Sequence, residues 1–215
     1  MNKKQVLETL GLPDAFEGFQ QVPNTKLVGW NGDTAVFGKL VREVKPKTII
    51  EVGSWMGQSS CNFGRNVKAN NLDTAVICVD TWLGSVEHWQ DPAIKPMLEL
   101  ENGRPTFYKR FLTNAINEGV SDVIVPLSLP SLIAGNYLKA NKITADLIYI
   151  DGSHDQKDVY NDLELYWQLL APGGLCFGDD APWISVITAV KAFSAEVGVP
   201  TAVQGINWFL RKRLE

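Results

Sequence analysis

The sequence has few of the residues that would mark a secreted, membrane-bound or zinc-binding protein. Its three cysteines, Cys61, Cys78 and Cys176, are too few and too scattered for a disulfide framework or for the paired spacing of zinc ligands. No uninterrupted apolar run reaches about 18 residues, and the N-terminal stretch has no apolar segment of signal-peptide length. We therefore expect a cytoplasmic protein with no membrane partner.

Positive charge is also scarce. The chain has 20 Lys and Arg residues against 24 Asp and Glu residues, a formal net charge of -4, and its longest basic cluster is the short Arg211-Lys212-Arg213. Such a chain lacks the basic surface that grips nucleic-acid phosphates. We expect small-molecule partners rather than nucleic acid, and the sequence leaves a homo-oligomer open.

The pattern of apolar residues indicates one α/β domain over residues 1–215. A chain of this length with 45% hydrophobic residues can bury one sizeable core. From about residue 47, short β-branched runs alternate with segments of helical periodicity, which is typical of a mostly parallel sheet with helices on both faces. Residues 1–46 are expected to form covering helices with a loop at 28–33. The seven predicted strands span 48–52, 75–80, 123–127, 145–151, 174–178, 200–203 and 206–210.

One segment is too long for simple alternation of strands and helices. About forty residues separate the predicted strands at 75–80 and 123–127, and only residues 106–119 have the pattern of a crossover helix. Residues 83–104 form an insertion near the carboxyl end of a strand, where open α/β sheets bind ligands. A lid or substrate-binding element is therefore predicted there. Two further helices are predicted, one ended by Ala171-Pro172-Gly173-Gly174 and one after Asp180.

The first motif that carries chemistry is Thr48-Ile-Ile-Glu-Val-Gly-Ser-Trp-Met-Gly-Gln-Ser-Ser60. Gly53 and Gly57 let the backbone turn tightly, and amides at the helix start near Gln58 offer donors to an anionic group. The G-x-x-x-G spacing differs from the G-x-G-x-x-G of dinucleotide sites. Glu51 favours a positively charged cofactor with an amino-acid portion, because its carboxylate can help to receive an ammonium group, directly or through water. An ordinary strand-to-helix turn is the alternative.

A second signal is the carboxylate of Asp80, which ends an apolar strand. In nucleoside-binding sheets this position accepts hydrogen bonds from ribose hydroxyls, although Asp at a strand end also forms turns. The neighbouring Trp82 suits stacking on an adenine, with a place in the core or lid as the alternative.

Three more carboxylates follow two predicted strands. Asp151 ends one strand, and Asp179 and Asp180 end the next, so all three project from one sheet edge if those strands are neighbours. Clustered carboxylates repel one another unless a hard divalent cation with oxygen ligands lies between them. Magnesium is favoured over zinc because no cysteine or paired histidine joins the group. Helix capping by one of the three is the alternative.

Two histidines complete the set of candidates. His154 lies three residues after Asp151 at a helix start, and its ordinary pKa of about 6.5 suits it to take a proton from a substrate hydroxyl. A hydrogen bond to the backbone is the plainer interpretation. His88 lies in the insertion and is expected to face the substrate or the solvent.

Together, the segments IIEVGSWMGQSS, VICVDTWLGS and IYIDGSHDQKDVYNDLELYWQLLAPGGLCFGDD resemble class I S-adenosylmethionine (SAM)-dependent methyltransferases of the small metal-dependent O-methyltransferase type. The acidic spacing is similar to the catechol O-methyltransferase arrangement. The Asp-Gly-Ser-His and Gly-Asp-Asp segments are more similar to the macrocin O-methyltransferase and cephalosporin hydroxylase-like group. The resemblance covers roughly residues 28–210 and implies a Rossmann-like methyltransferase fold.

The resemblance also implies roles for individual residues. It implies a divalent cation, Mg²⁺ or another, on Asp151, Asp179 and Asp180, with His154 and Asp151 catalytic. The catechol-type pattern has Asn and Lys where this chain has Asp180 and His154, which argues against catechol as the acceptor. The residues implied to bind SAM are Glu51, Gly53, Ser54, Gly57, Ser59, Asp80, Thr81, Trp82, Ser131 and Asp151.

The function expected from the sequence is therefore metal-dependent O-methylation of a hydroxyl on a small molecule such as a sugar, natural product or phenolic diol. The cation would lower the pKa of that hydroxyl, and His154 would remove its proton. Two alternatives stay open at this point: a metal-independent methyltransferase with His154 as base, and a SAM-binding protein without catalysis.

Overall fold

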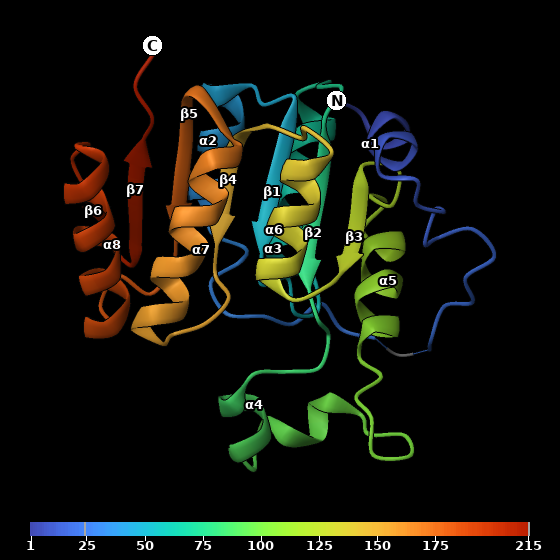
Figure 1. Ribbon diagram of the computed structural model, residues 1–215. Coiled ribbons are helices and arrows are strands. Elements are labelled where there is room, and N and C mark those ends of the chain that lie inside the picture. The colour runs from blue at the N-terminus through green and yellow to red at the C-terminus, as the bar shows by residue number, and fades with distance from the viewer. Residues whose placement is uncertain (24, 215) are drawn as a thin grey trace.

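A seven-stranded sheet forms the centre of the computed structural model, which describes residues 1–23 and 25–214 (Figure 1). The strand order is β3-β2-β1-β4-β5-β7-β6. Strands β1 to β5 run parallel, and β7 is antiparallel to both β5 and β6. The strands are β1 (Thr48–Val52), β2 (Ala75–Asp80), β3 (Ile124–Ser128), β4 (Ala145–Ile150), β5 (Leu170–Gly178), β6 (Ala202–Gln204) and β7 (Asn207–Arg211).

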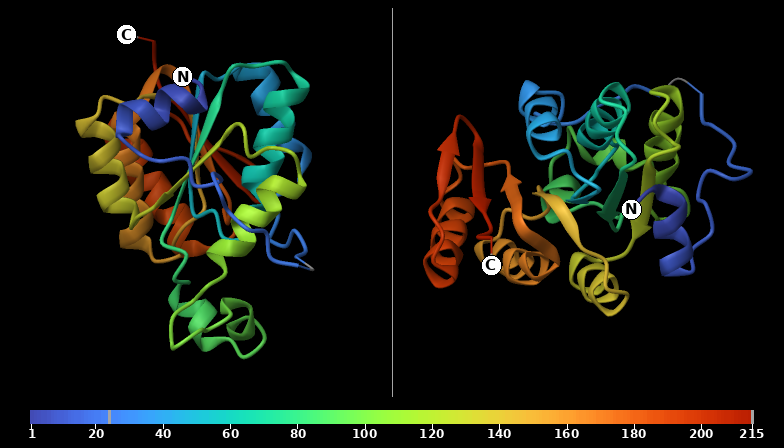
Figure 2. Two further views of the ribbon diagram at one scale, coloured as in Figure 1. Left: turned by 90° about the vertical axis from the view of Figure 1, so that its right-hand side faces the viewer. Right: turned by 90° about the horizontal axis from the view of Figure 1, so that it is seen from above.

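Helices cover both faces of this sheet, as Figure 2 shows. One apolar cluster joins α1, α6, α7 and α8 to one face, and a second joins α2, α3 and α5 to the other. The strands β1 and β2 are apolar along almost their whole length because both of their faces are covered. The helices are α1 (Lys3–Leu10), α2 (Ala35–Val44), α3 (Gln58–Ala69), α4 (Val86–Gln90), η1 (Lys95–Leu98), α5 (Tyr108–Asn117), α6 (Ser131–Ala140), α7 (Gln156–Leu169) and α8 (Ile184–Val197).

The predicted α/β fold with a mostly parallel seven-stranded sheet is confirmed, with one correction at β5. The sequence predicts that Ala171-Pro172-Gly173-Gly174 ends the preceding helix as a loop. Instead, α7 ends at Leu169 and the strand begins at once, since Leu170 pairs with Ala145 of β4. The register then shifts before Leu147 pairs with Leu175, and this irregularity accommodates a proline that has no N–H to donate.

Helix α7 begins at Gln156, after a short loop that follows β4, and a side chain caps its first turn. The Asp155 carboxylate accepts hydrogen bonds from the backbone amides of Lys157 and Asp158. The predicted apolar stripe is buried against the sheet, with Val159 and Leu163 among its residues. Helix α6, which fills the crossover between β3 and β4, is missing from the prediction.

The insertion at residues 83–104 extends beyond the carboxyl ends of the strands, below the sheet in Figure 1. It contains α4 and η1, and its end is anchored by the fully buried side chains of Leu98 and Phe107. The other long helices pack on the faces of the sheet. The insertion is therefore the element that partly encloses the carboxyl edge of the sheet.

The strand order reverses direction between β1 and β4, because β2 and β3 lie on one side of β1 whereas β4 and β5 lie on the other. In open α/β sheets, ligands bind outside the carboxyl ends of the strands at such a reversal point. In the described part of the chain, no helix has the length and apolar character needed to cross a membrane.

Candidate functional site

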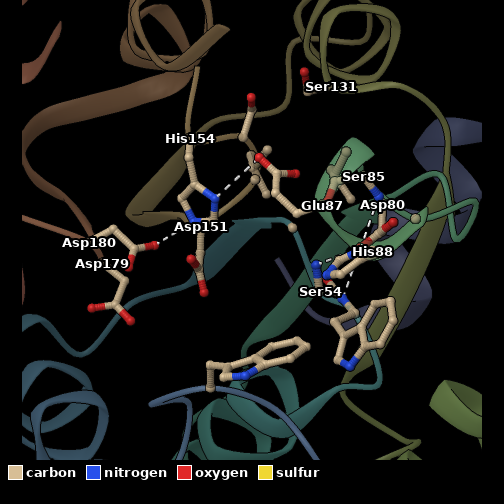
Figure 3. Close-up of a pocket in the computed structure, with 18 of the residues that line it drawn as sticks. Ser54, Asp80, Ser85, Glu87, His88, Ser131, Asp151, His154, Asp179 and Asp180 are labelled. Atoms are coloured by element: carbon tan, nitrogen blue, oxygen red, sulfur yellow. Dashed lines mark hydrogen bonds and ion pairs between the residues drawn. The ribbon is translucent and has the colours of Figure 1, made fainter. Parts of the chain in front are cut away.

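A cavity of about 850 Å³ lies at the predicted place, outside the carboxyl ends of β1, β2, β4 and β5. Figure 3 shows its polar side chains, which come from the loops after these strands and from the insertion. Its lining includes most of the predicted cofactor residues: Gly53, Ser54, Ser59, Asp80, Thr81, Ser131 and Asp151. The predicted residues at the ends of the four strands therefore share one cavity.

The loop between β1 and α3 passes very close to the end of β4. Gly53 has a φ of +87°, and a Cβ at this position would lie 2.0 Å from the Asp151 carbonyl oxygen. Since the Asp151 amide also donates a hydrogen bond to the Val52 carbonyl, the two strand ends are held together. Glycine is required at residue 53 by this contact and by its φ.

The Asp80 carboxylate holds the same loop in place. One of its oxygens accepts hydrogen bonds from the Ser54 and Trp55 amides, at 3.0 and 2.8 Å, and the other accepts one from the Trp82 amide at 2.7 Å. Burial raises the pKa of Asp80, and these three amide bonds oppose that effect. Asp80 therefore forms a turn, the alternative considered from the sequence, while it also lines the cavity.

Glu51 lies beneath the loop and does not line the cavity, so of the two routes expected from the sequence, direct contact with an ammonium group is wrong for this structure, and contact through water stays a prediction. The residue is 0% exposed, and the hydroxyls of Ser54 and Ser60 donate hydrogen bonds to one of its carboxylate oxygens. Burial raises the pKa of Glu51. Its contacts in the structure are with the loop and not with the space a ligand would fill.

Gly57 and Trp82 are also outside the cavity lining. Gly57 is the N-cap residue of α3 with a φ of +89°, and a Cβ there would lie 3.0 Å from the Phe111 ring. The Trp82 side chain is 2% exposed and packs against Tyr108 and Phe111. Stacking of Trp82 on an adenine is therefore wrong for this structure, and the core role applies.

The three predicted metal-binding carboxylates come together as the strand order requires. Asp151, Asp179 and Asp180 each place an oxygen within 4.8 Å of the others, because β4 and β5 are neighbours. Burial raises the pKa of Asp151 well above its ordinary value, and the charges of Asp179 and Asp180 raise it further. An all-oxygen set at this spacing fits a hard divalent cation such as Mg²⁺.

Neutral donors orient two of these carboxylates. The Tyr149 hydroxyl donates a hydrogen bond to Asp151 at 2.9 Å. The side-chain amides of Asn31 and Asn207 donate to the two oxygens of Asp179, at 3.1 and 3.3 Å. The cluster therefore has fixed side-chain directions.

His154 lies beside this carboxylate cluster. Its Nε2 is 2.9 Å from an Asp180 oxygen, and its ring stacks on Trp183 with 4.5 Å between centroids. Its Nδ1 is 3.8 Å from the Glu87 carboxylate, which belongs to α4 of the insertion. The hydrogen bond to Asp180 raises the pKa of His154. A side-chain partner thus replaces the backbone hydrogen bond considered from the sequence.

Sequence reasoning missed one wall of the cavity, the loop at 28–33. Trp30 is 51% exposed and stacks on His88, which itself lies 4.2 Å from Trp55, centroid to centroid. Gly32 lies so close to α3 that a Cβ would be 2.6 Å from the Ser59 amide nitrogen. The sequence feature that could have indicated this wall is Trp30 between Gly29 and Gly32. The rings that Trp30 contacts, His88 and Trp55, are distant from it in the sequence.

A family model described as "Methyltransferase domain" matches residues 50–181. The uncharacterized protein y4gI of Sinorhizobium fredii (strain NBRC 101917 / NGR234) is 27% identical over 135 residues. The match covers 62% of this chain but only 13% of that protein, so the chain spans a small part of this curated relative.

Solved structures share the fold at low sequence identity. An O-methyltransferase from Bacillus cereus in complex with SAH has a TM-score of 0.59 and 15% identity, over 99% of this chain and 93% of that one. The O-methyltransferase TomG from Streptomyces achromogenes, involved in tomaymycin synthesis and solved with SAM, has a TM-score of 0.59 and 14% identity, over 97% and 90% of the two chains.

The three amide bonds to Asp80 generate a prediction about the loop. Asp80→Ala should speed hydrogen exchange of the Ser54 and Trp55 amides by about tenfold or more, because hydrogen bonds to a charged group contribute about 1.5–3 kcal/mol each. Asp91→Ala is the matched control, since the Asp91 carboxylate accepts a hydrogen bond from the Ala93 amide and none from the Ser54 or Trp55 amide. Hydrogen exchange read by mass spectrometry or NMR checks this, and unchanged exchange at both amides would contradict it.

Proposed function

This chain belongs to the methyltransferase domain family, and from that premise we propose that it transfers a methyl group from SAM to a hydroxyl oxygen of a small-molecule acceptor with the help of a divalent cation. The observation that carries the proposal is the single cavity that joins the loop after β1 to the cluster of Asp151, Asp179 and Asp180. The SAM and SAH complexes of the two structural neighbours support the choice of methyl donor.

The donor would bind where the predicted cofactor residues line the cavity. Ser54 and Ser59 follow β1, Thr81 follows β2, and Ser131 begins α6. This places polar groups at several points along one cavity, which suits a ligand with an amino-acid portion, a ribose and a base. Ser131 beside Leu129 and Leu132 is the position proposed for the adenine.

Asp151, Asp179 and Asp180 would hold the cation, and its chemistry when bound is to lower the pKa of an acceptor hydroxyl. His154 would take the hydroxyl proton. When the neutral ring donates its Nε2 hydrogen to Asp180, the lone pair is on Nδ1, which is then the atom that accepts the proton. The acceptor oxygen forms a bond to the methyl carbon as the bond from that carbon to sulfur breaks, and the electron pair remains on sulfur.

Orientation is the main contribution expected of the other residues. Holding two reactants in line can contribute about 7–11 kcal/mol of barrier lowering. The insertion and the aromatic rings of Trp30 and Trp183 also line the cavity, and the acceptor would bind beside them. Closure of the insertion as a lid is part of this proposal.

A metal-independent reaction is the second candidate, and the hydrogen bonds of the cluster favour it. Asn31, Asn207, Tyr149 and His154 already provide donors to the three carboxylates. In that case the Asp180 and His154 pair alone would remove the proton. Loss of turnover in the presence of a chelator supports the first candidate, and unchanged turnover supports the second.

The expectations about location and partners stay predictions. The three cysteines are free and buried, which agrees with a cytoplasmic location. A homo-oligomer, like the expected lack of nucleic-acid and membrane partners, is untested.

The carboxylate cluster generates the first prediction of this subsection. Asp151→Asn should abolish Mn²⁺ binding seen by electron paramagnetic resonance and reduce turnover at least about a hundredfold, because it removes one charged ligand of three. SAM binding, measured by calorimetry, should persist. Asp122→Asn, which changes a surface residue paired with Lys68, is the matched control. If the Asp151→Asn variant binds Mn²⁺ and turns over as well as the wild-type protein, the metal proposal is wrong.

The position of His154 beside the carboxylate cluster leads to a prediction about the general base. His154→Gln should reduce turnover by about 10²- to 10⁴-fold, the usual contribution of a general base, with SAM and Mn²⁺ binding nearly unchanged. Turnover is measured as SAH release with the best acceptor from a panel of sugars, diols and phenols. Trp183→Phe, which keeps an aromatic ring beneath the imidazole, should retain most activity. Equal losses in turnover and SAM affinity would argue for a structural role instead.

A further inference from the structure

The charge of the cavity is strongly one-sided. Among the described residues that line it there are eight carboxylates and no lysine or arginine. The eight are Asp80, Glu87, Asp91, Asp151, Asp158, Asp162, Asp179 and Asp180. The chain as a whole is nearly balanced, with 20 basic and 24 acidic residues, so the cavity concentrates negative charge far beyond the composition.

The proposed donor and cation do not account for all of this charge. A divalent cation would offset two of the three negative charges of Asp151, Asp179 and Asp180, and SAM carries one net positive charge that would offset the third. Glu87 and Asp91 lie apart from that cluster, in α4 and immediately after it. Within the described chain, no lysine or arginine forms a salt bridge with either of them. Lys95 of the same insertion lies over the Trp89 ring, 5.9 Å from its centroid, and does not line the cavity.

Aromatic rings line the same cavity as these two acids. Trp30 and Trp183 are 51% and 49% exposed and both line the cavity, with His88 and His154 stacked on them. Exposed indole faces bind the apolar face of a sugar ring and also attract cations. Carboxylates beside aromatic faces are therefore complementary to a ring that carries a positive charge.

We propose that the acceptor carries a protonated amine near the hydroxyl that is methylated, as an amino sugar does, and that Glu87 and Asp91 bind this ammonium group. The inference rests on the proposed function and adds the class of acceptor to it. Glu87 is placed for this role because its carboxylate is 3.8 Å from His154 Nδ1, so an ammonium held there brings its neighbouring hydroxyl to the proposed base. Figure 3 shows Glu87 directed toward His154.

The same arrangement rejects acceptors that carry a phosphate or diphosphate. Such a group is bound most strongly by arginine or lysine, and the described lining contains neither of them. Like charges brought together also repel strongly in a partly enclosed cavity. The proposal therefore favours a free amino sugar over a sugar attached to a nucleotide diphosphate.

The test uses the full chain saturated with SAH and Mg²⁺, with tryptophan fluorescence and calorimetry as readouts. The probes are glucosamine, glucose and glucose 6-phosphate, which differ in charge on one ring. Glucosamine should bind about tenfold more tightly than glucose, as expected for a charge-assisted hydrogen bond, and glucose 6-phosphate more weakly than glucose. The double variant Glu87→Gln with Asp91→Asn should bind glucosamine and glucose almost equally.

The matched control is Glu8→Gln with Asp122→Asn, which removes the same charge from surface residues paired with Lys4 and Lys68 and should keep the preference. Equal binding of glucosamine and glucose by the wild-type protein, a preference that survives in the Glu87 and Asp91 variant, or binding of none of the three sugars would each overturn the inference. SAH affinity is measured in every sample. If the protein does not bind SAH, the proposed function is refuted. If it binds SAH and gives any of those outcomes, only the proposal that the acceptor carries a protonated amine is refuted.

Discussion

Mutual repulsion among carboxylates at one sheet edge is the constraint on which the rest of the site depends. Asp151, Asp179 and Asp180 lie within 4.8 Å of one another because two neighbouring parallel strands end side by side. Charges this close in a partly buried place are costly unless a cation, a proton or hydrogen-bond donors compensate them. Tyr149 and Asn31 supply donors, and a divalent cation would supply the remaining charge. This repulsion is the reason why we propose a cation at the three carboxylates.

The loop after β1 is organised by a different set of acids. Asp80 accepts three backbone hydrogen bonds, and Glu51 is fully buried beneath the loop. Asp80 holds the loop by its backbone amides, and Glu51 supports it from below. Together they determine the shape of the cavity on the side that we propose for the methyl donor. The side chains of Glu87 and Asp91 add negative charge to the side of the cavity that we propose for the acceptor. One cavity thus combines acids that shape a loop, acids that suit a cation and acids that suit an acceptor.

The sequence predicted the parts of this arrangement that depend on local pattern. The strand Ala75–Asp80 is an apolar run that ends in an acid, and Asp151 and Asp179 directly follow two other strands, so the side chains of these acids are predicted at one edge of the sheet. The roles of Glu51 and Trp82 could not be predicted in the same way. An acid or an indole beside a glycine loop looks the same in sequence whether it faces a ligand or the core, and only the packing of Trp82 on Phe111 decides. The aromatic wall at Trp30 depends on contacts with residues more than fifty positions away, such as His88.

The most direct test of the account is a crystal structure of the protein grown with SAH and Mn²⁺ and measured near the manganese absorption edge. The account predicts SAH along the loop after β1, beside Asp80 and Ser131, together with an anomalous peak between Asp151, Asp179 and Asp180. SAH in that place without an anomalous peak would contradict the metal-dependent chemistry. A cavity free of SAH at saturating concentration would contradict the assignment of the site itself.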